Sequence, residues 1–196
     1  MKVGLYFGSF NPVHIAHLNL ANHLLDNNIV DEVWFVVSPC NPLKRQTDLL
    51  DENIRMNMLN LAIAENPNLK TSDIEFSMPI PSYTIDTLEK LSSFYPDIQF
   101  FLIIGSDNAL VFNLWKDYER ILKHYPVLVY PRPGYDFKQV EALYPQMRLL
   151  PTPDYDISST EIRKAIAENK DVSGWLHPAV LQYILDNNFF VVQTKK

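Results

Sequence analysis

The sequence predicts an α/β fold in which helices cover both faces of a doubly wound, mostly parallel sheet. Two observations predict it. Short apolar segments alternate with segments of helical periodicity along all 196 residues, which is the pattern of strands linked by crossover helices. The short segments are rich in Val, Ile and Phe, as strands covered on both faces are. We therefore expect residues 1–196 to form a single Rossmann-like domain with a short helical C-terminal extension.

Each predicted element rests on its own local pattern. Six short apolar segments are predicted strands: Lys2–Phe7, Glu32–Ser38, Thr71–Phe76, Gln99–Ile104, Val127–Tyr130 and Arg148–Leu150. Seven segments with apolar residues three and four positions apart are predicted helices: Ile15–Asp26, Glu52–Ala64, Ile85–Phe94, Tyr118–Leu122, Phe137–Leu143, Ser159–Ala167 and Pro178–Asn187. Thr84 is a predicted N-cap, and so is either Ser158 or Ser159. Pro178 suits a first helical turn.

The composition excludes several classes of protein. Hydrophobic residues make up 47% of the chain and charged residues 20%, which is typical of a globular protein rather than a disordered one. A net charge of −6 argues against broad nucleic-acid binding, which needs a basic face. No apolar run reaches the roughly 20 residues that cross a bilayer, and Met1-Lys2-Val3 leads directly into a strand without room for a signal peptide. The single cysteine, Cys40, cannot form an internal disulfide. We therefore expect a soluble, cytoplasmic protein.

The most informative segment is Gly8–His17, which reads GSFNPVHIAH. It joins the first predicted strand to the first predicted helix, where a doubly wound sheet binds phosphates through free backbone N–H groups and the helix dipole. His14 and His17 add imidazole donors there. The segment lacks the G-x-x-x-x-G-K-[ST] and G-x-G-x-x-G patterns, so it is neither a P-loop nor a dinucleotide fingerprint. The two histidines also lack the nearby Cys or carboxylate ligands of a zinc site.

A second candidate anion site lies in Ile157–Arg163, which reads ISSTEIR. Ser158, Ser159 and Thr160 open a predicted helix, where their hydroxyls can cap free N–H groups. Arg163 follows one turn later, which capping alone does not explain. Hydroxyls, free N–H groups and a guanidinium can together bind an anion. The alternative is a capped helix without a ligand.

Three further residues are candidates because of their loops. Lys44 lies in the Pro-rich loop after the second strand, so it can reach a bound phosphate unless it is only solvated surface. Asp107 follows the strand Gln99–Ile104, at the centre of the sheet, where a carboxylate can hold ribose hydroxyls; turn formation is the alternative. Trp115 lies in the next loop, where it either packs or stacks against a flat ligand.

These motifs resemble those of a known family. Gly8–His17 is similar to the H-x-G-H signature of the nucleotidyltransferase superfamily, and Ile157–Arg163 resembles its I-S-S-T-x-I-R motif. Further segments resemble the bacterial nicotinate-nucleotide adenylyltransferases within it: Asn41-Pro42-Leu43-Lys44, Arg55, Ser82–Leu88, Ile104–Asp107, Leu114-Trp115 and Arg132-Pro133-Gly134. Two positions depart from the family pattern, because Ala16 replaces the usual Gly and Leu43 stands where many members carry His.

The resemblance implies transfer of AMP from ATP to nicotinate mononucleotide, with release of pyrophosphate, in NAD biosynthesis. By this resemblance, the catalytic residues are His14, His17, Lys44 and Arg163. The residues implied for ATP are Gly8, Ser9, Phe10, His14, His17, Ser158, Ser159, Thr160 and Arg163. Those implied for the acceptor are Tyr83, Thr84, Asp107 and Trp115, with the indole stacking on the pyridine ring. Mg²⁺ is expected to be carried mainly by the ATP phosphates, since the motifs include no carboxylate cage.

Other interpretations stay open at this point. The same phosphate-binding residues could serve an adenylyltransferase for nicotinamide mononucleotide, or an adenylyl- or cytidylyltransferase with another phosphorylated acceptor. The chain could also be a non-catalytic nucleotide sensor, although the two histidines together with Lys44 and Arg163 exceed what binding alone needs. A nucleic-acid-binding adaptor fits the acidic balance poorly. The sequence indicates no oligomeric state.

Overall fold

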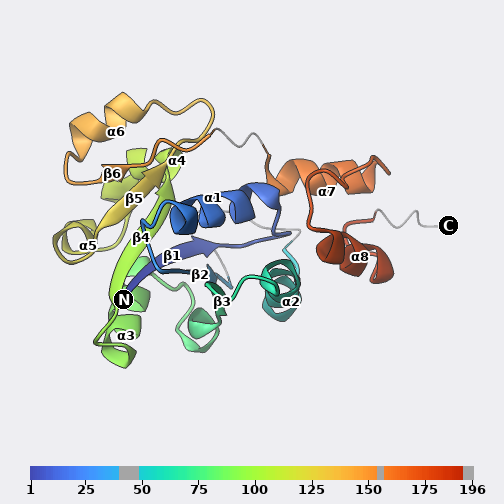
Figure 1. Ribbon diagram of the computed structural model, residues 1–196, viewed down its shortest axis with the longest axis horizontal. Coiled ribbons are helices and arrows are strands. Elements are labelled where there is room, and N and C mark those ends of the chain that lie inside the picture. The colour runs from blue at the N-terminus through green and yellow to red at the C-terminus, as the bar shows by residue number, and fades with distance from the viewer. Residues whose placement is uncertain (40–48, 154–156, 192–196) are drawn as a thin grey trace.

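Six strands form one parallel sheet in the order β3-β2-β1-β4-β5-β6 (Figure 1). The computed structural model describes residues 1–39, 49–153 and 157–191. All five strand pairings recorded for these residues are parallel, which confirms the predicted doubly wound sheet. The strands are β1 (Lys2–Gly8), β2 (Glu32–Val37), β3 (Leu69–Ser72), β4 (Gln99–Gly105), β5 (Val127–Tyr130) and β6 (Arg148–Leu149).

Helices cover both faces of this sheet, as the alternating pattern predicts. They are α1 (Ile15–Asp26), α2 (Glu52–Ile63), α3 (Thr84–Phe94), α4 (Ser106–Leu110), α5 (Tyr118–His124), α6 (Phe137–Leu143), α7 (Ser159–Ala167) and α8 (Pro178–Asp186). On one face, Leu24 of α1 shares a buried cluster with Phe35 of β2. On the other face, Leu88 of α3 shares a second cluster with Leu102 of β4. Burial of both faces explains why the strands are apolar throughout.

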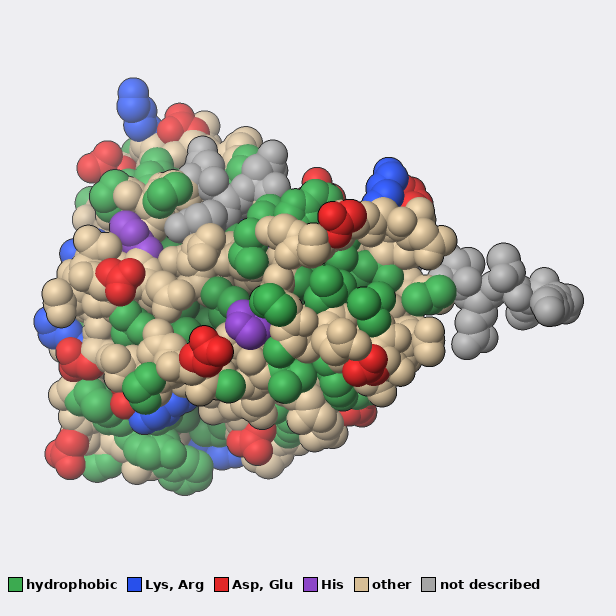
Figure 2. Space-filling model, turned by 45° about the vertical axis from the view of Figure 1, so that its right-hand side comes forward, with side chains coloured by type: hydrophobic (Ala, Val, Ile, Leu, Met, Phe, Trp, Pro, Cys, Tyr) green, Lys and Arg blue, Asp and Glu red, His purple; other side chains and the backbone are tan. Residues whose placement is uncertain are grey.

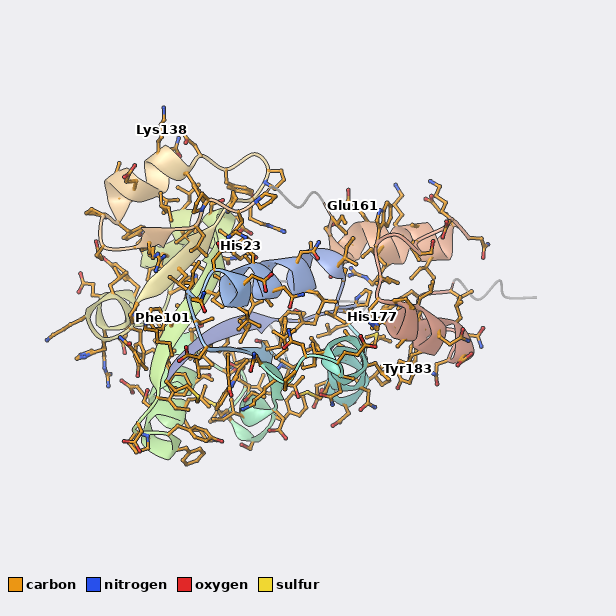
Figure 3. The ribbon with its side chains drawn as sticks, in the orientation of Figure 1. His23, Phe101, Lys138, Glu161, His177 and Tyr183 are labelled. Atoms are coloured by element: carbon orange, nitrogen blue, oxygen red, sulfur yellow. The ribbon has the colours of Figure 1, made fainter. Side chains whose placement is uncertain are left out.

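The helices α7 and α8 form the expected C-terminal extension. Ile162 of α7 and Val180 of α8 lie in the same buried cluster as α1 and α2. The ring of His177 accepts a hydrogen bond from the backbone N–H of Ala179 (3.3 Å) and so caps α8 (Figure 3). Pro178 occupies the first turn of that helix, as predicted. In Figure 1 both helices lie at the end of the molecule toward which β1 points, which brings the start of α7 near the loop after β1.

Two local predictions were wrong. The third strand covers Leu69–Ser72 rather than Thr71–Phe76, because Ile74–Ser77 forms a 3-10 turn, η1. Phe76 packs against the buried core from that turn. The turn therefore has the apolar residues that predict a strand, although its backbone is not extended. Tyr83, not Thr84, is the N-cap residue of α3. Ser158 does cap α7, as expected.

The position of the candidate site follows from the strand order. β1 and β4 are neighbours, although the chain runs from β1 to β2 and β3 in one direction and from β4 to β5 and β6 in the other. The loops at the carboxyl ends of two such strands leave on opposite sides of the sheet and open a crevice between them. Among the described helices, none combines the length and the apolarity that a membrane span requires.

Candidate active site

A cleft of about 830 Å³ lies at the carboxyl ends of β1 and β4. The predicted site residues within the described chain all line it: Gly8, Ser9, Phe10, His14, His17, Tyr83, Thr84, Asp107, Trp115, Ser158, Ser159, Thr160 and Arg163. Lys44 lies outside the described residues, so its phosphate contact stays a prediction. The sheet thus brings together motifs that are separated by more than half of the chain.

Phe10 forms the floor of the loop that follows β1. Its side chain is only 3% exposed, and its ring meets those of Tyr6 and His17 edge-on, with centroids 5.7 and 5.1 Å away. The ring lies so close to Gly8 that a Cβ atom there would come within 2.8 Å of it. Gly8 therefore allows the aromatic floor, and the ring of Phe10 supports the loop from the core.

Arg55 holds the backbone of the same loop from below. Its guanidinium is fully buried and donates to the carbonyl oxygens of Ser9 (2.7 Å), Ser38 (2.9 Å) and Leu50 (2.8 Å). These bonds join the turns after β1 and β2. Arg55 is one of the residues by which the sequence resembles the family, and it lies in the second predicted helix. The structure shows that its side chain fixes the backbone of these turns.

His14 and His17 stack at the start of α1, with ring centroids 3.7 Å apart and an interplanar angle of 28°. The backbone N–H of His14 donates to Nδ1 of His17 (3.3 Å). A neutral His17 therefore carries its proton on Nε2. Nδ1 of His14 is buried and has no hydrogen-bond partner among the described residues, and His14 lines the cleft.

Both imidazoles are neutral at physiological pH. Burial, with a smaller contribution from the nearby Arg132, lowers the pKa of His14 from 6.5 to about 3. Burial also lowers the pKa of His17 well below its ordinary value, with smaller contributions from His14 and Arg132. The ring nitrogens therefore act as neutral hydrogen-bonding groups, and their strength as donors can rise when negative charge develops beside them.

The C-terminal motif docks directly on the N-terminal one. The hydroxyl of Ser159 donates to the carbonyl oxygen of Pro12 (2.9 Å), and Arg163 donates to that of Asn11 (2.9 Å). Arg163 also donates to the hydroxyl of Thr160 (3.4 Å). The two candidate anion sites are therefore parts of one site, with the amino end of α7 beside the loop that precedes α1.

The side chain of Ser158 caps the amino end of α7. Its hydroxyl donates to the carboxylate of Glu161 (2.6 Å) and accepts from the backbone N–H of the same residue (3.2 Å). The carboxylate in turn accepts from the backbone N–H of Ser158 (3.0 Å). Glu161 is labelled on α7 in Figure 3. This capping box is the structural alternative that the sequence left open, and it orients the N–H groups at the start of the helix.

On the opposite wall, two segments frame the predicted acceptor pocket. Tyr83 precedes α3, and Trp115 follows a 3-10 turn, η2 (Phe112–Leu114). Lys116 connects them, since its ammonium donates to Asp86 (2.8 Å) and lies 4.9 Å from the ring centroid of Tyr83. Nε1 of Trp115 is buried without a hydrogen-bond partner among the described residues. The indole of Trp115 also lines the cleft.

Asp107 lies in the first turn of α4, a short helix that the sequence did not predict. Its carboxylate approaches the guanidinium of Arg132 (3.9 Å), whose backbone N–H donates to the buried hydroxyl of Ser106 (2.9 Å). A Cβ atom on Gly105 would come within 2.8 Å of the Arg132 side chain. These contacts hold the loops after β4 and β5 together at the crevice.

Sequence reasoning named only part of the lining, and the residues to which it gave no site role include Tyr6, Glu75, Tyr130 and Arg132. The hydroxyl of Tyr6 donates to that of Tyr130 (3.2 Å), and burial raises the pKa of both. Both tyrosines lie near the carboxyl ends of interior strands, β1 and β5, which is the signal that could have identified them. Arg132 was noted only as a landmark of the family pattern.

Among the described residues, the Lys and Arg side chains that line the cleft are Lys116, Arg132 and Arg163. On the face shown in Figure 2, Lys and Arg side chains stand singly among acidic and apolar ones, in keeping with the net charge of −6. Within the described ranges, no three His, Cys, Asp or Glu side chains come together in a group that could hold a metal ion. The cleft instead offers guanidinium, hydroxyl, imidazole and backbone N–H groups, a donor set that suits phosphates.

Comparison with known proteins identifies the same class. A family model described as cytidylyltransferase-like matches residues 5–165. A protein of Bacteroides thetaiotaomicron named "Probable nicotinate-nucleotide adenylyltransferase" is 50% identical over 94% of this chain and 91% of its own. One of Flavobacterium johnsoniae with the same name is 44% identical over 97% and 99%. A solved structure, "Plasmodium falciparum nicotinic acid mononucleotide adenylyltransferase complexed with NaAD", has a TM-score of 0.83 at 23% identity and covers 96% of this chain and 97% of its own.

The sheet is doubly wound, and the crevice between β1 and β4 holds the histidine pair and the docked helix with its Ser, Thr and Arg. This is the framework of a nucleotidyltransferase of the cytidylyltransferase-like family. The sequence identities of 44–50% with the two bacterial relatives, over nearly the whole length of each chain, narrow this class to one group of enzymes. The chain belongs to the nicotinate-nucleotide adenylyltransferases, as its motifs predict.

Proposed function

We propose that the chain transfers the AMP part of ATP to nicotinate mononucleotide and releases pyrophosphate. One observation carries this proposal: Ser159 and Arg163 dock on the turn at Asn11 and Pro12. Two phosphate-binding motifs therefore face one cleft, which also contains an aromatic pocket for an acceptor. The names of the curated relatives support the choice of nicotinate mononucleotide.

The reaction balances without a covalent enzyme intermediate. A phosphate oxygen of nicotinate mononucleotide attacks the α-phosphorus of ATP, and the bond from that phosphorus to the bridging oxygen breaks on the opposite side. The products are nicotinate adenine dinucleotide and pyrophosphate. Such a transfer depends on positioning and on stabilising the charge of the transferring and leaving oxygens. The cleft provides donors for both purposes.

His14 and His17 would contact the α- and β-phosphate region as neutral imidazoles. Their burial favours this role, since neutral donors cost less to hold in a dry site than cations. Ser159, Thr160 and Arg163 would hold the β- and γ-phosphates at the positive end of the α7 dipole. Lys44 would assist from the loop after β2.

Tyr83, Thr84 and Trp115 would form the pocket for the pyridine ring, with the indole stacking on it. Asp107 would accept hydrogen bonds from ribose hydroxyls. Mg²⁺ would enter with the triphosphate and neutralise part of its charge. The residues of the cleft fit that arrangement, because its described carboxylates, Glu75 and Asp107, lie on separate elements and do not form a metal-binding group.

The test is a side-by-side measurement of pyrophosphate release from ATP. Nicotinate mononucleotide, nicotinamide mononucleotide and phosphopantetheine serve as acceptors at equal concentrations. We expect the highest kcat/KM with nicotinate mononucleotide. Preference for either other acceptor would replace the proposed substrate. Nucleotide binding without pyrophosphate release from ATP in the presence of any of the three acceptors would identify a sensor.

A further inference from the structure

The acceptor end of the cleft contains a buried carboxylate to which no role has been given. Glu75 lies in η1, its side chain is 3% exposed, and it lines the cleft together with Tyr83, Thr84 and Trp115. Neither the phosphate motifs nor the proposed transfer of AMP uses it. A negative charge in a site that receives phosphates therefore calls for an explanation.

The hydrogen bonds of Glu75 come from neutral groups. The hydroxyl of Ser82 donates to one carboxylate oxygen (2.9 Å) and the hydroxyl of Thr87 to the other (2.8 Å). Among the described residues, no Lys, Arg or His lies within the 4.0 Å of an ion pair with it. Lys116, at the same end of the cleft, is paired with Asp86 instead.

A buried carboxylate without a cation is costly, because hydroxyl donors replace only part of its hydration. A ligand that carries a positive charge into the pocket would reduce that cost. The ring nitrogen of a pyridine mononucleotide is bonded to ribose and carries a full positive charge. The aromatic face of Trp115 in the same wall also favours a cation.

We propose that Glu75 supplies the negative charge that makes the acceptor pocket selective for a pyridinium ring over an uncharged ring of the same shape. This inference rests on the proposed function, since it concerns the acceptor of that reaction. It assigns Glu75 a role in specificity through charge and predicts discrimination against reduced, dihydropyridine mononucleotides.

Two ligands that differ in ring charge test the proposal: nicotinamide mononucleotide and its reduced dihydro form. Each is measured as a competitive inhibitor against nicotinate mononucleotide in the pyrophosphate assay. For the unmodified protein we expect the pyridinium form to bind about tenfold more tightly, as one charge contact in a partly buried site can provide. Equal inhibition constants would overturn the proposal without the need for any variant.

Glu75→Gln then removes the charge and keeps the shape. We expect the ratio of the two inhibition constants to fall about tenfold toward one, with the KM for ATP unchanged. Glu89→Gln is the matched control, because Glu89 lies on α3 outside the cleft, paired with Arg120. Ser82→Ala keeps the carboxylate, and so it should weaken both ligands without changing their ratio. If Glu75→Gln weakens both equally, Glu75 only holds the loop.

Failure of this inference is separable from failure of the proposed function. If the unmodified protein releases no pyrophosphate with nicotinate mononucleotide, the proposed function is wrong. If it does so and the ratio of inhibition constants is one, or is unaffected by Glu75→Gln, only the role of Glu75 is wrong.

Discussion

The guanidinium of Arg163 donates a hydrogen bond to the carbonyl oxygen of Asn11 at 2.9 Å, across 152 positions of the sequence. The same side chain lines the cleft. Arg163 therefore has two functions in the proposed site: it fixes the turn before α1, and it presents its remaining N–H groups to a ligand.

Replacing Arg163 tests this double function. We expect Arg163→Ala to lower kcat/KM for ATP by about 100-fold, because a charge-assisted donor to the phosphates is lost. Arg163→Lys should recover only part, since an ammonium cannot reach the Asn11 carbonyl and the phosphates with the same geometry. Steady-state kinetics give the answer. Lys164→Ala, an exposed residue of the same helix, is the control, and an equal loss in that variant would argue against the assignment.

His17 offers a test of the transition-state role. His17→Ala should reduce kcat by roughly 100- to 1,000-fold, because a donor that strengthens during phosphoryl transfer is removed. The fold should persist, as judged by circular dichroism. His17→Gln should keep more activity because its amide can still donate. His23 lies further along α1 (Figure 3) and does not line the cleft, so His23→Ala should be near normal. Near-normal turnover in a folded His17→Ala protein would refute the role.

The neutral His14 predicts a dependence of stability on pH. Its folded pKa of about 3 lies below the unfolded value of 6.5, so between these values the unfolded chain takes up a proton that the folded protein does not. Stability is therefore full above pH 6.5 and decreases as the pH falls. The expected loss from His14 is about 2 kcal/mol between pH 7.5 and 5. Urea unfolding at both pH values measures it.

The control for this pH effect is His14→Gln, which cannot titrate in this range. Its free energy of unfolding should decrease less between pH 7.5 and 5 than that of the unmodified protein. Parallel decreases in the two proteins would show that His14 does not stay neutral on folding.

Replacing Trp115 tests whether nicotinate mononucleotide and ATP bind at different ends of the cleft. Trp115→Ala should raise the KM for nicotinate mononucleotide about tenfold, because the aromatic plate for the pyridine ring is lost. The KM for ATP should change little. Trp175, which is partly exposed and does not line the cleft, provides the control Trp175→Ala. A loss confined to ATP would contradict the acceptor pocket.

Most of the fold could be predicted from the sequence, because its segments are locally consistent. The bounds of α1, α6 and α7 match the periodic segments, and β5 matches its apolar run. The boundary of the third strand failed, because Ile74 and Phe76 pack, partly buried, against the core from a turn rather than from a strand. An alternating hydrophobic pattern indicates which residues are buried, but it does not show whether they belong to a strand or to a turn.

The sequence predicts those parts of the site whose functional residues lie close together along the chain. The histidine pair and the Ser-Ser-Thr-x-x-Arg helix start each carry their pattern within a few residues. Tyr130 and Glu75 do not, because they reach the cleft only through strand register and the path of η1. A buried glutamate within a predicted strand gives no local sign that it lines a cleft. Such residues become visible only when the parallel sheet brings loop ends together.

The docking of α7 on the Asn11–Pro12 turn also bears on how the protein is made. The last strand of the sheet ends at Leu149, ten residues before α7 begins. A ribosome therefore completes every strand before it delivers the helix that closes the phosphate site. These contacts span about 150 residues, and long-range contacts pay more loop-closure entropy than local ones. We therefore expect binding competence to be acquired last. We expect a copy interrupted before that helix to lack half of the phosphate clamp, together with the part of the core that Ile162 and Val180 form with α1 and α2.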